Sequence, residues 1–507
     1  MVVSELRTRR PNIVVIQADQ LAAAALGAYG NTVVKSPHID ALGAEGVVFD
    51  RAYCNSPLCA PSRASMMTGQ LPSQIGAYDN GADFGSSVPT FAHHLRAAGY
   101  HTALVGRMHF IGPDQLHGFE ERLTTDVYPA GLDMVPDWEL PEEDRLPWYH
   151  DAGSVFTAGV SAATVQRDFD DEVLFRSLRH LNDRARSLDD QPFLLVSSFI
   201  HPHDPYEPTL EHWRRYDDVE IDDPRVATLP LEEQDPHSRR LLEMSGFDQK
   251  EPDAEQVRRA RRAYYACVSY VDDHVGAIVR RLDELGLREN TVVVLTSDHG
   301  DMLGERGLWY KMSPYEQSAR VPLVVSAPGR LESRRVDTPV SLLDLLPTLT
   351  DLAGVGEVGT PGRSLVPIAA GDEHEPEDVV IEYLAEGVTT PHLTIVRGRH
   401  KLVRCPGDPD QLFDVTADPD ELVNLVDDPA HAELVQSLRE ALASRYDVGS
   451  LSHDVLASQG RRRVVHEALS AGAPTAWDHQ PPHRPDYVRG DFWTALERGR
   501  VPARDLG

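Results

Sequence analysis

The residues Asn12-Ile13-Val14-Val15-Ile16 decide the fold class of this chain of 507 residues. A continuous β-branched apolar run predicts a strand that is covered on both faces, as in a parallel sheet between helices. Similar runs recur at 102–105, 193–196, 291–295 and 322–325, and helical patterns lie between them, as at 90–98 and 257–285. This alternation predicts a doubly wound α/β domain with a large, mostly parallel central sheet flanked by helices.

Polar residues gather where four of these runs end. They are Asp19 and Gln20, Arg107 and His109, His201 and His203, and Asp298 and His299. In open α/β sheets, sites form outside the carboxyl ends of the strands. We therefore expect these side chains to meet in one functional site.

The length of the chain predicts more than one structural unit, because it exceeds what one hydrophobic core usually supports. Residues 1–370 are interpreted as a catalytic α/β domain. Short segments between Gly, Pro and Asp turns follow, and they predict a C-terminal subdomain at 371–470 with a short antiparallel sheet backed by a helix near 430–446. Residues 471–507 are expected to form an extended tail that packs on the body or on a neighbouring subunit.

The charge of the chain is strongly acidic, with 49 Lys and Arg against 80 Asp and Glu and a formal net charge of −31. This balance argues against nucleic acid as a partner, because phosphates require the opposite sign. It disfavours a sulfated polymer and suits a cationic substrate or a metal ion. A generally soluble acidic surface explains most of the charge equally well.

The cysteine content favours a reducing compartment. Only four cysteines occur, and their spacing does not form a disulfide framework. Residues 1–10 carry charge without an apolar core, and no apolar run reaches the length of a membrane span. We expect a soluble cytoplasmic protein without a membrane partner.

The stretch Cys59-Ala60-Pro61-Ser62-Arg63 resembles a helix start with proline in its first turn. Such a helix would direct its positive end toward an anion. Arg63 is then the expected partner of anionic oxygens. The alternative is a small buried cysteine beside a proline turn, with Arg63 on an ordinary helix face.

Asp19, Asp298 and His299 are candidate metal ligands. Carboxylate oxygens suit a hard divalent cation such as Ca²⁺, Mg²⁺ or Mn²⁺, and the imidazole keeps Mn²⁺ open. Asp19 alone could equally cap a helix. Gln20 is a weaker candidate, because its amide either ligates through oxygen or bonds locally.

His109 and His201 are the candidate acid and base, because an imidazole transfers protons near neutral pH. The chain has 22 histidines, and the strand-end context distinguishes these two. Lys311 and Arg107 would supply cations for anionic oxygens. Asn80 could donate a further bond or simply form a turn.

Several longer stretches carry a resemblance to a known family. They are Ser56 to Arg63, Gly69 to Ser73, Ala77 to Asn80, Met108 to Asp126, His201 to Tyr206, Ser297 to Met312, Asp408 to Asp414 and Ala417 to Leu422. In these stretches the chain resembles the type I, formylglycine-dependent sulfatases of the alkaline phosphatase superfamily, and among them the choline sulfatases.

The resemblance implies a fold, a reaction and a cofactor set. The fold is the alkaline phosphatase-like sandwich, and the reaction is hydrolysis of a small, choline-sulfate-like sulfate monoester. A maturation enzyme would oxidise Cys59 to formylglycine, whose hydrate attacks sulfur. One divalent metal, Ca²⁺ first and Mn²⁺ or Mg²⁺ as alternatives, would be held there. A homodimer or homotetramer in the cytoplasm is also implied.

The resemblance also implies roles for single residues. The metal would be bound by Asp19, Asp298 and His299 together with formylglycine at position 59. Sulfate would be bound by Arg63, Asn80 and Lys311, and His109 and His201 would act as acid and base. Trp138, Trp148 and Glu386 would form a pocket for a cationic alcohol.

Three features depart from the family pattern, and one of them is the terminal stretch Val488 to Pro502, which matches the family's closing motif only loosely. Arg107 stands where many sulfatases have lysine, so its geometry does not transfer directly. Residues 131–135, including Met134, replace a segment in which the choline sulfatases carry a further tryptophan. Two alternative functions also stay open: hydrolysis of phosphonate monoesters or phosphodiesters by a related fold with the same formylglycine and Asp-His metal pair, and a catalytically silent binding protein.

Overall fold

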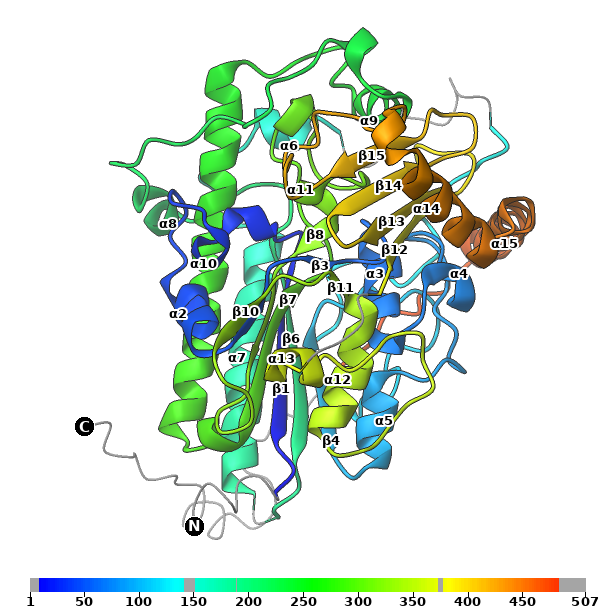
Figure 1. Cartoon of the computed structure of the whole chain (residues 1–507). Coiled ribbons are helices and arrows are strands. Elements are labelled where there is room, and N and C mark those ends of the chain that lie inside the picture. The colour runs from blue at the N-terminus through cyan, green and yellow to red at the C-terminus, as the bar shows by residue number, and fades with distance from the viewer. Residues whose placement is uncertain (1–8, 141–150, 188, 373–376, 483–507) are drawn as a thin grey trace.

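An eight-stranded sheet runs through the centre of the molecule (Figure 1). The structure is a computed structural model that describes residues 9–140, 151–187, 189–372 and 377–482. The order of the strands is β10-β2-β9-β7-β1-β6-β4-β5. Their bounds are β1 Asn12–Asp19, β2 Val47–Phe49, β4 His101–Gly106, β5 Glu121–Arg122, β6 Phe193–Pro202, β7 Thr291–Ser297, β9 Leu323–Ser326 and β10 Arg334–Val336.

The sheet is mostly parallel, as the apolar runs predict. Strand β1 pairs in parallel with both β6 and β7, and β4 pairs in parallel with β6. The run at 322–325 forms β9, which differs from the expectation of a parallel strand. It lies antiparallel to both β7 and β2, because a buried apolar run records burial on two faces and not strand direction.

Helices cover both faces of this sheet, which explains the apolar runs. Val14 and Ile16 of β1 belong to one core cluster with helices of one face. Ile13 and Val15 belong to a second cluster with helices of the opposite face. The first face carries α2 Pro37–Glu45, α7 Val165–Arg186 and α10 Ala254–Glu284; the second carries α3 Cys59–Thr68, α5 Phe91–Ala97, α12 Leu345–Leu352 and α13 Val366–Ala370.

The C-terminal subdomain contains the predicted antiparallel sheet. Its strands are β12 Val379–Tyr383, β13 His392–Arg397, β14 His400–Arg404 and β15 Gln411–Asp414, in that order. Helix α14 Ala432–Arg445 packs on it through Val435, Leu438 and Leu442. A three-stranded sheet of β11 Val340–Ser341, β3 Ala52–Tyr53 and β8 Arg320–Val321 lies between the two parts.

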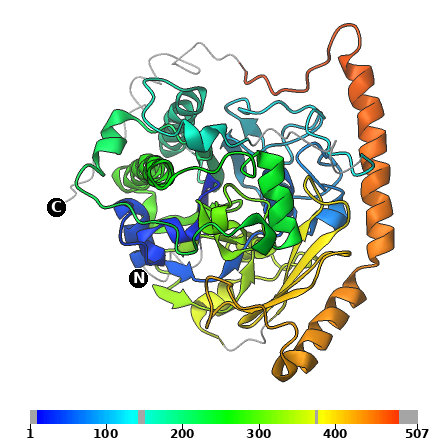
Figure 2. The same cartoon turned by 90° about the horizontal axis from the view of Figure 1, so that it is seen from above.

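Helix α15 Val448–Ser470 follows α14 along the outside of the molecule (Figure 2). The apolar pattern does not predict this helix, because Leu451 and Val455 are its only buried aliphatic side chains. The shorter helices are α4 Pro72–Ile75, α6 Gly153–Phe156, α8 Leu210–Arg214, α9 Pro236–Ser245 and α11 Glu316–Ala319. Within the described ranges, no helix combines the length and apolarity that a membrane span requires.

The described part of the tail packs on this same chain. Asp478 accepts a hydrogen bond from the backbone of Ala130 at 3.0 Å, and His479 contacts the carbonyl oxygen of Arg122 at 3.1 Å. Trp477 packs against a small cluster with Ala60 and Leu132. The tail therefore borders the segment that follows Cys59, and residues 483–507 lie outside the described residues.

Candidate active site

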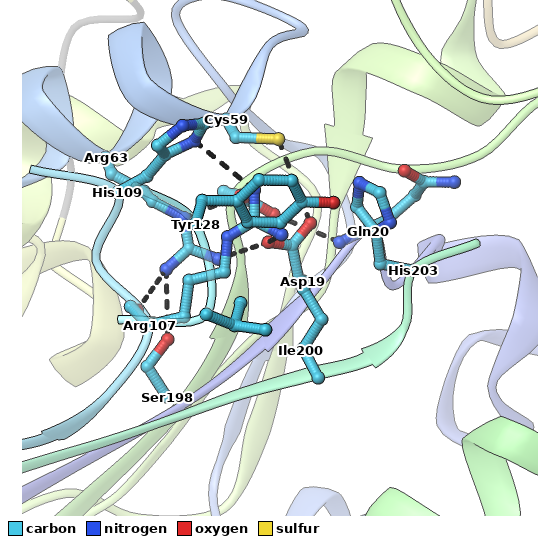
Figure 3. A network of polar contacts seen from close by, with 12 residues as sticks. Asp19, Gln20, Cys59, Arg63, Arg107, His109, Tyr128, Ser198, Ile200 and His203 are labelled. Atoms are coloured by element: carbon cyan, nitrogen blue, oxygen red, sulfur yellow. Dashed lines mark hydrogen bonds and ion pairs between the residues drawn. The ribbon is translucent and has the colours of Figure 1, made fainter. Parts of the chain in front are cut away.

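The ends of four neighbouring strands bring the predicted polar residues together. Asp19 is the last residue of β1, and Asp298 follows β7 directly. Arg107 follows β4, and its Nη1 lies 2.6 Å from Oδ2 of Asp19. Figure 3 shows the side chains of Asp19 and Arg107 pointing toward one another. The strand-end pattern in the sequence thus locates the site.

Cys59 lies at the first position of helix α3, within the same cluster. Its Sγ is 3.2 Å from Nε2 of His299 and 4.0 Å from Oδ1 of Asp19. Asp19, Cys59, Asp298 and His299 offer ligand atoms that all lie within 4.8 Å of one another, and all four side chains are buried. Two carboxylates and one imidazole around a buried point fit a divalent cation.

The hydrogen bonds of His299 fix its tautomer. Its Nδ1 lies 3.0 Å from the carbonyl oxygen of Gly300, which only accepts, so Nδ1 carries the proton. Nε2 is then unprotonated and faces Cys59. Burial lowers the pKa of His299, against the neighbouring carboxylate of Asp298. The ring is therefore neutral at neutral pH, which is the form that ligates a metal.

Arg63 joins the two carboxylates. Its Nη2 lies 2.8 Å from Oδ2 of Asp19, and its Nε lies 2.8 Å from Oδ2 of Asp298. Burial raises the pKa of both carboxyls, but the guanidinium groups of Arg107 and Arg63 outweigh this effect and hold the pKa of each below its usual range. Both carboxylates stay ionised as potential ligands.

Gln20 orients Lys311 through its amide. Lys311 Nζ donates to Oε1 of Gln20 at 2.7 Å, while Nε2 of Gln20 donates to Asp301 at 2.6 Å and to Asp204 at 3.2 Å. Both ends of the amide are thus engaged with protein groups. The sequence predicts Gln20 as a weaker candidate for a metal ligand, and in the structure its oxygen accepts a hydrogen bond from Lys311.

The two histidines of the turn after β6 have different environments. His201 donates from Nδ1 to Asp170 at 2.7 Å and packs on Tyr270, which belong to helices α7 and α10. His203 has Nε2 at 2.9 Å from Nζ of Lys311. In Figure 3, His203 lies beside Gln20 and Tyr128. Of these two histidines, His203 is therefore the one that contacts Lys311, and His201 contacts Asp170.

The position of His109 depends on a carboxylate that the sequence analysis missed. Asp126 accepts the backbone N–H groups of Met108 and His109 at 3.0 Å each, and Arg122 holds it at 3.0 Å. His109 has φ of 53°, a left-handed conformation that is unfavourable for histidine. Asp126 is therefore the group that maintains the backbone at this position.

Tyr128 is a further residue of the site that the sequence analysis did not assign. The guanidinium carbon of Arg107 lies 4.2 Å from the centre of its ring, and the ring of His109 stacks at 5.3 Å. Arg107 Nη2 also donates to Nδ1 of His109 at 3.3 Å, so the neutral ring carries its proton on Nε2. Tyr128 lies in an irregular segment, where no periodic pattern marks it.

Of the predicted substrate-binding residues that remain, only Asn80 has a contact directly beside Cys59. Asn80 accepts a hydrogen bond from the backbone of Ala60 at 3.0 Å, directly beside Cys59. Trp138 is buried and donates from Nε1 to the carbonyl oxygen of Ala385 at 2.7 Å. Glu386 is also buried, next in sequence to that contact. Trp148 lies outside the described residues.

Comparison with known proteins agrees with this geometry. Residues 11–355 match the sulfatase family. This chain belongs to the sulfatase family. Residues 304–447 of this sulfatase match the C-terminal region of N-sulphoglucosamine sulphohydrolase, and residues 453–502 match the C-terminal region of choline sulfatase enzymes.

Curated relatives of this sulfatase support the assignment. A choline-sulfatase of Rhizobium meliloti (strain 1021) is 46% identical over 486 residues, which cover 94% of each chain. An arylsulfatase of Clostridium perfringens (strain 13 / Type A) is 30% identical over 68% of this chain and 75% of its own. The protein is thus a sulfuric ester hydrolase.

The fold is shared with solved structures. A phosphonate monoester hydrolase of Agrobacterium radiobacter superimposes with a TM-score of 0.67 and 25% identity over 86% of this chain and 95% of its own. The structure of BT4656 with D-glucosamine-2-N,6-O-disulfate has a TM-score of 0.69 at 22% identity, over 88% and 99% of the two chains. The second likeness concerns the fold alone.

Proposed function

We propose that this sulfatase hydrolyses a small organic sulfate monoester, similar to choline sulfate, to an alcohol and inorganic sulfate. The single observation that carries the proposal is the position of Cys59, whose Sγ lies within 4.0 Å of both His299 and Asp19. A nucleophile precursor and a set of metal ligands thus share one buried point.

The residues around Cys59 fit an anionic substrate. Arg63, Arg107 and Lys311 outnumber the carboxylates of Asp19 and Asp298, and all five side chains are buried. A divalent ion held by Asp19, Asp298 and His299 would add Lewis acidity toward a sulfuryl oxygen. Formylglycine at position 59, made by a maturation enzyme, would supply a hydrated aldehyde whose collapse releases sulfate. Ca²⁺ is our first choice of metal, with Mn²⁺ and Mg²⁺ as alternatives.

Proton transfer is assigned to His109 and His203. The Nδ1 of His203 donates to the carbonyl oxygen of Asp204 at 2.6 Å, so its Nε2 accepts from Lys311. Lys311 can thus donate one of its N–H protons to the departing alcohol oxygen while Nε2 of His203 accepts another, so the two residues act as one proton-donating pair. His109, with its proton on Nε2 and Nδ1 held by Arg107, is the second proton-transfer group.

The alcohol portion is proposed to be cationic. The relative that is 46% identical carries the name choline-sulfatase, and the net charge of −31 suits a cationic substrate. Trp138, Trp148 and Glu386 remain the residues proposed to contact the ammonium group, because aromatic faces and carboxylates bind quaternary ammonium.

Phosphonate monoester hydrolysis is the second candidate function, favoured by the 25% identical phosphonate monoester hydrolases of the same fold. Rates on an aryl sulfate and on the matching aryl phosphonate separate the two reactions. We expect the sulfate to react faster, and a faster phosphonate would reverse the assignment.

The experiment that tests the main proposal is a panel of sulfate esters that includes choline-O-sulfate, with sulfate release as the readout. Peptide mass spectrometry on the active preparation reports whether position 59 carries an aldehyde. We expect turnover, an aldehyde, and loss of turnover in Cys59→Ala. An intact thiol in active protein, or full turnover by Cys59→Ala, would overturn the mechanism.

We also propose that the protein acts in the cytoplasm as a homodimer or homotetramer. The four cysteines Cys54, Cys59, Cys267 and Cys405 are buried and unpaired by disulfides, which is consistent with a reducing compartment. The oligomer is what the resemblance to the choline sulfatases implies. Sedimentation of the purified protein tests the subunit number.

A further inference from the structure

Helix α15 is attached to the body of the molecule by a buried ion pair between Arg462 and Asp79. Arg462 Nη1 and Nη2 each lie 2.7 Å from one carboxylate oxygen of Asp79, and the two side chains are 5% and 0% exposed. Ser458 accepts a further hydrogen bond from Nε of Arg462 at 3.1 Å. A bidentate, desolvated pair of this kind fixes orientation as well as distance.

Asp79 lies directly before Asn80, which borders Cys59. Asn80 Oδ1 accepts the backbone N–H of Ala60 at 3.0 Å, at the start of helix α3. Asp79 Oδ1 also accepts the backbone N–H of Gly81 at 2.9 Å. The carboxylate that Arg462 binds therefore shapes the turn that carries Asn80.

The same turn is packed tightly on its other side. A Cβ at Gly81 would lie 2.6 Å from the backbone of both Met134 and Val135, so only glycine fits this approach. The segment that follows is held by α15 as well: Gln459 Oε1 accepts the backbone N–H of Trp138 at 3.1 Å. Helix α15 thus contacts both the turn that carries Asn80 and the segment that packs on Gly81.

We infer that Arg462 is a positioning residue for the reaction, which acts through Asp79 to fix the amide of Asn80 beside Cys59. The inference rests on the proposed function, and within it on the sulfate-binding role that the resemblance to the sulfatases implies for Asn80. It explains why a helix with few buried apolar side chains is held by polar contacts. It also assigns a role in the reaction to an element far outside residues 11–355.

A double-mutant cycle between Arg462 and Asn80 tests the inference. The variants are Arg462→Met, Asn80→Ala and the pair together, with Arg461→Met as control because Arg461 is exposed on the same helix. The readouts are kcat/KM for an aryl sulfate and the Kd of inorganic sulfate by calorimetry. Thermal unfolding checks that each variant is folded.

We expect Arg462→Met to lower kcat/KM and to weaken sulfate binding by about tenfold each. In the Asn80→Ala background the same change should have no further effect, because its action passes through Asn80. Arg462→Lys keeps the positive charge but not the bidentate guanidinium, so its kcat/KM and its affinity for sulfate should lie between those of the wild type and of Arg462→Met. If Arg462→Met does not fold, the cycle is run with Arg462→Lys.

Three results would overturn the inference. They are equal losses in both backgrounds, wild-type values in Arg462→Met, or an absence of sulfate binding by the wild type. Failure of the proposed function appears differently: the wild type would bind sulfate but release none from any ester. In that case the calorimetric cycle still decides the role of Arg462.

Discussion

His203 and Lys311 form a hydrogen-bonded pair at the site, with Nε2 of the histidine 2.9 Å from Nζ of the lysine. The two residues come from segments 108 positions apart in the chain. His201 lies only two residues before His203, yet it contacts Asp170 instead. The two histidines thus have different surroundings, since Asp170 accepts both the ring and the backbone N–H of His201 while His203 faces Lys311.

Substitution of the two histidines by asparagine separates these roles. The amide of asparagine can replace the Nδ1 donor of each ring, but nothing replaces Nε2. We expect His203→Asn to lower kcat by a factor of about 10² to 10⁴, the usual range for general acid–base catalysis. His201→Asn should keep most of the activity, since its Nδ1 contact with Asp170 is retained. Steady-state kinetics of both variants gives the answer, and a larger loss in His201→Asn would return the role to His201.

The sequence predicts much of the site because strand ends are easy to recognise. Apolar runs place Asp19, Arg107 and Asp298 at one edge of a sheet, and the structure brings them together. The choice between His201 and His203 depends on how the chain turns after β6, which no local pattern specifies. The sequence does not predict Tyr128 as a site residue either, because Tyr128 lies in an irregular segment without a periodic pattern.

Two features of the fold are not predicted by the sequence: the direction of strand β9 and the presence of helix α15. The apolar run of β9 predicts a strand but does not encode its antiparallel direction. Helix α15 buries Gln459 and Arg462 in place of an apolar stripe, so its periodicity is hidden. Its contacts are with Asp79 and Trp138, more than 300 residues away in the sequence.

Replacement of Arg107 by lysine tests whether its shape matters beyond its charge. The guanidinium pairs with Asp19 at 2.6 Å, donates to His109 at 3.3 Å and stacks on Tyr128 at 4.2 Å. Lysine keeps only the charge. We expect kcat/KM to fall by about tenfold in Arg107→Lys. Arg335→Lys, whose side chain is 54% exposed, serves as control. Equal kinetics for Arg107→Lys and the wild type would show that charge alone suffices.

We expect the buried carboxyl group of Asp344 to make the folding stability depend on pH. Burial raises the pKa of Asp344 to about 6, above the value of about 3.9 expected in the unfolded chain. Between these values the folded state holds a proton that the unfolded state lacks. The contribution of Asp344 to the free energy of unfolding therefore falls as the pH rises from about 4 to about 6, by at most about 1.4 kcal/mol per pH unit.

Urea unfolding at pH 5 and pH 7 measures this effect. Relative to the wild type, Asp344→Asn should lose less stability, or gain more, on going from pH 5 to pH 7. The exposed Asp427→Asn should follow the wild type at both pH values. A pH dependence of Asp344→Asn equal to that of the wild type would show that Asp344 is ionised in the folded protein throughout this range.

Removal of single ligands tests the metal site. We expect the wild type to contain one divalent ion per chain by elemental analysis, and His299→Ala and Asp298→Asn to contain little. After chelation, added Ca²⁺, Mn²⁺ or Mg²⁺ should raise the unfolding temperature of the wild type, because an ion that binds only the folded state stabilises it. The cation with the largest effect at equal concentration identifies the preferred metal.

A second cluster of possible ligands provides the control for this experiment. It consists of Glu211, His212 and Asp273, whose ligand atoms are also within 4.8 Å of one another, but Arg215 already pairs with its carboxylates. Asp273→Asn is therefore the matched control and should leave the metal content unchanged. Metal that persists in His299→Ala and Asp298→Asn, or that disappears in Asp273→Asn, would place the ion away from Cys59.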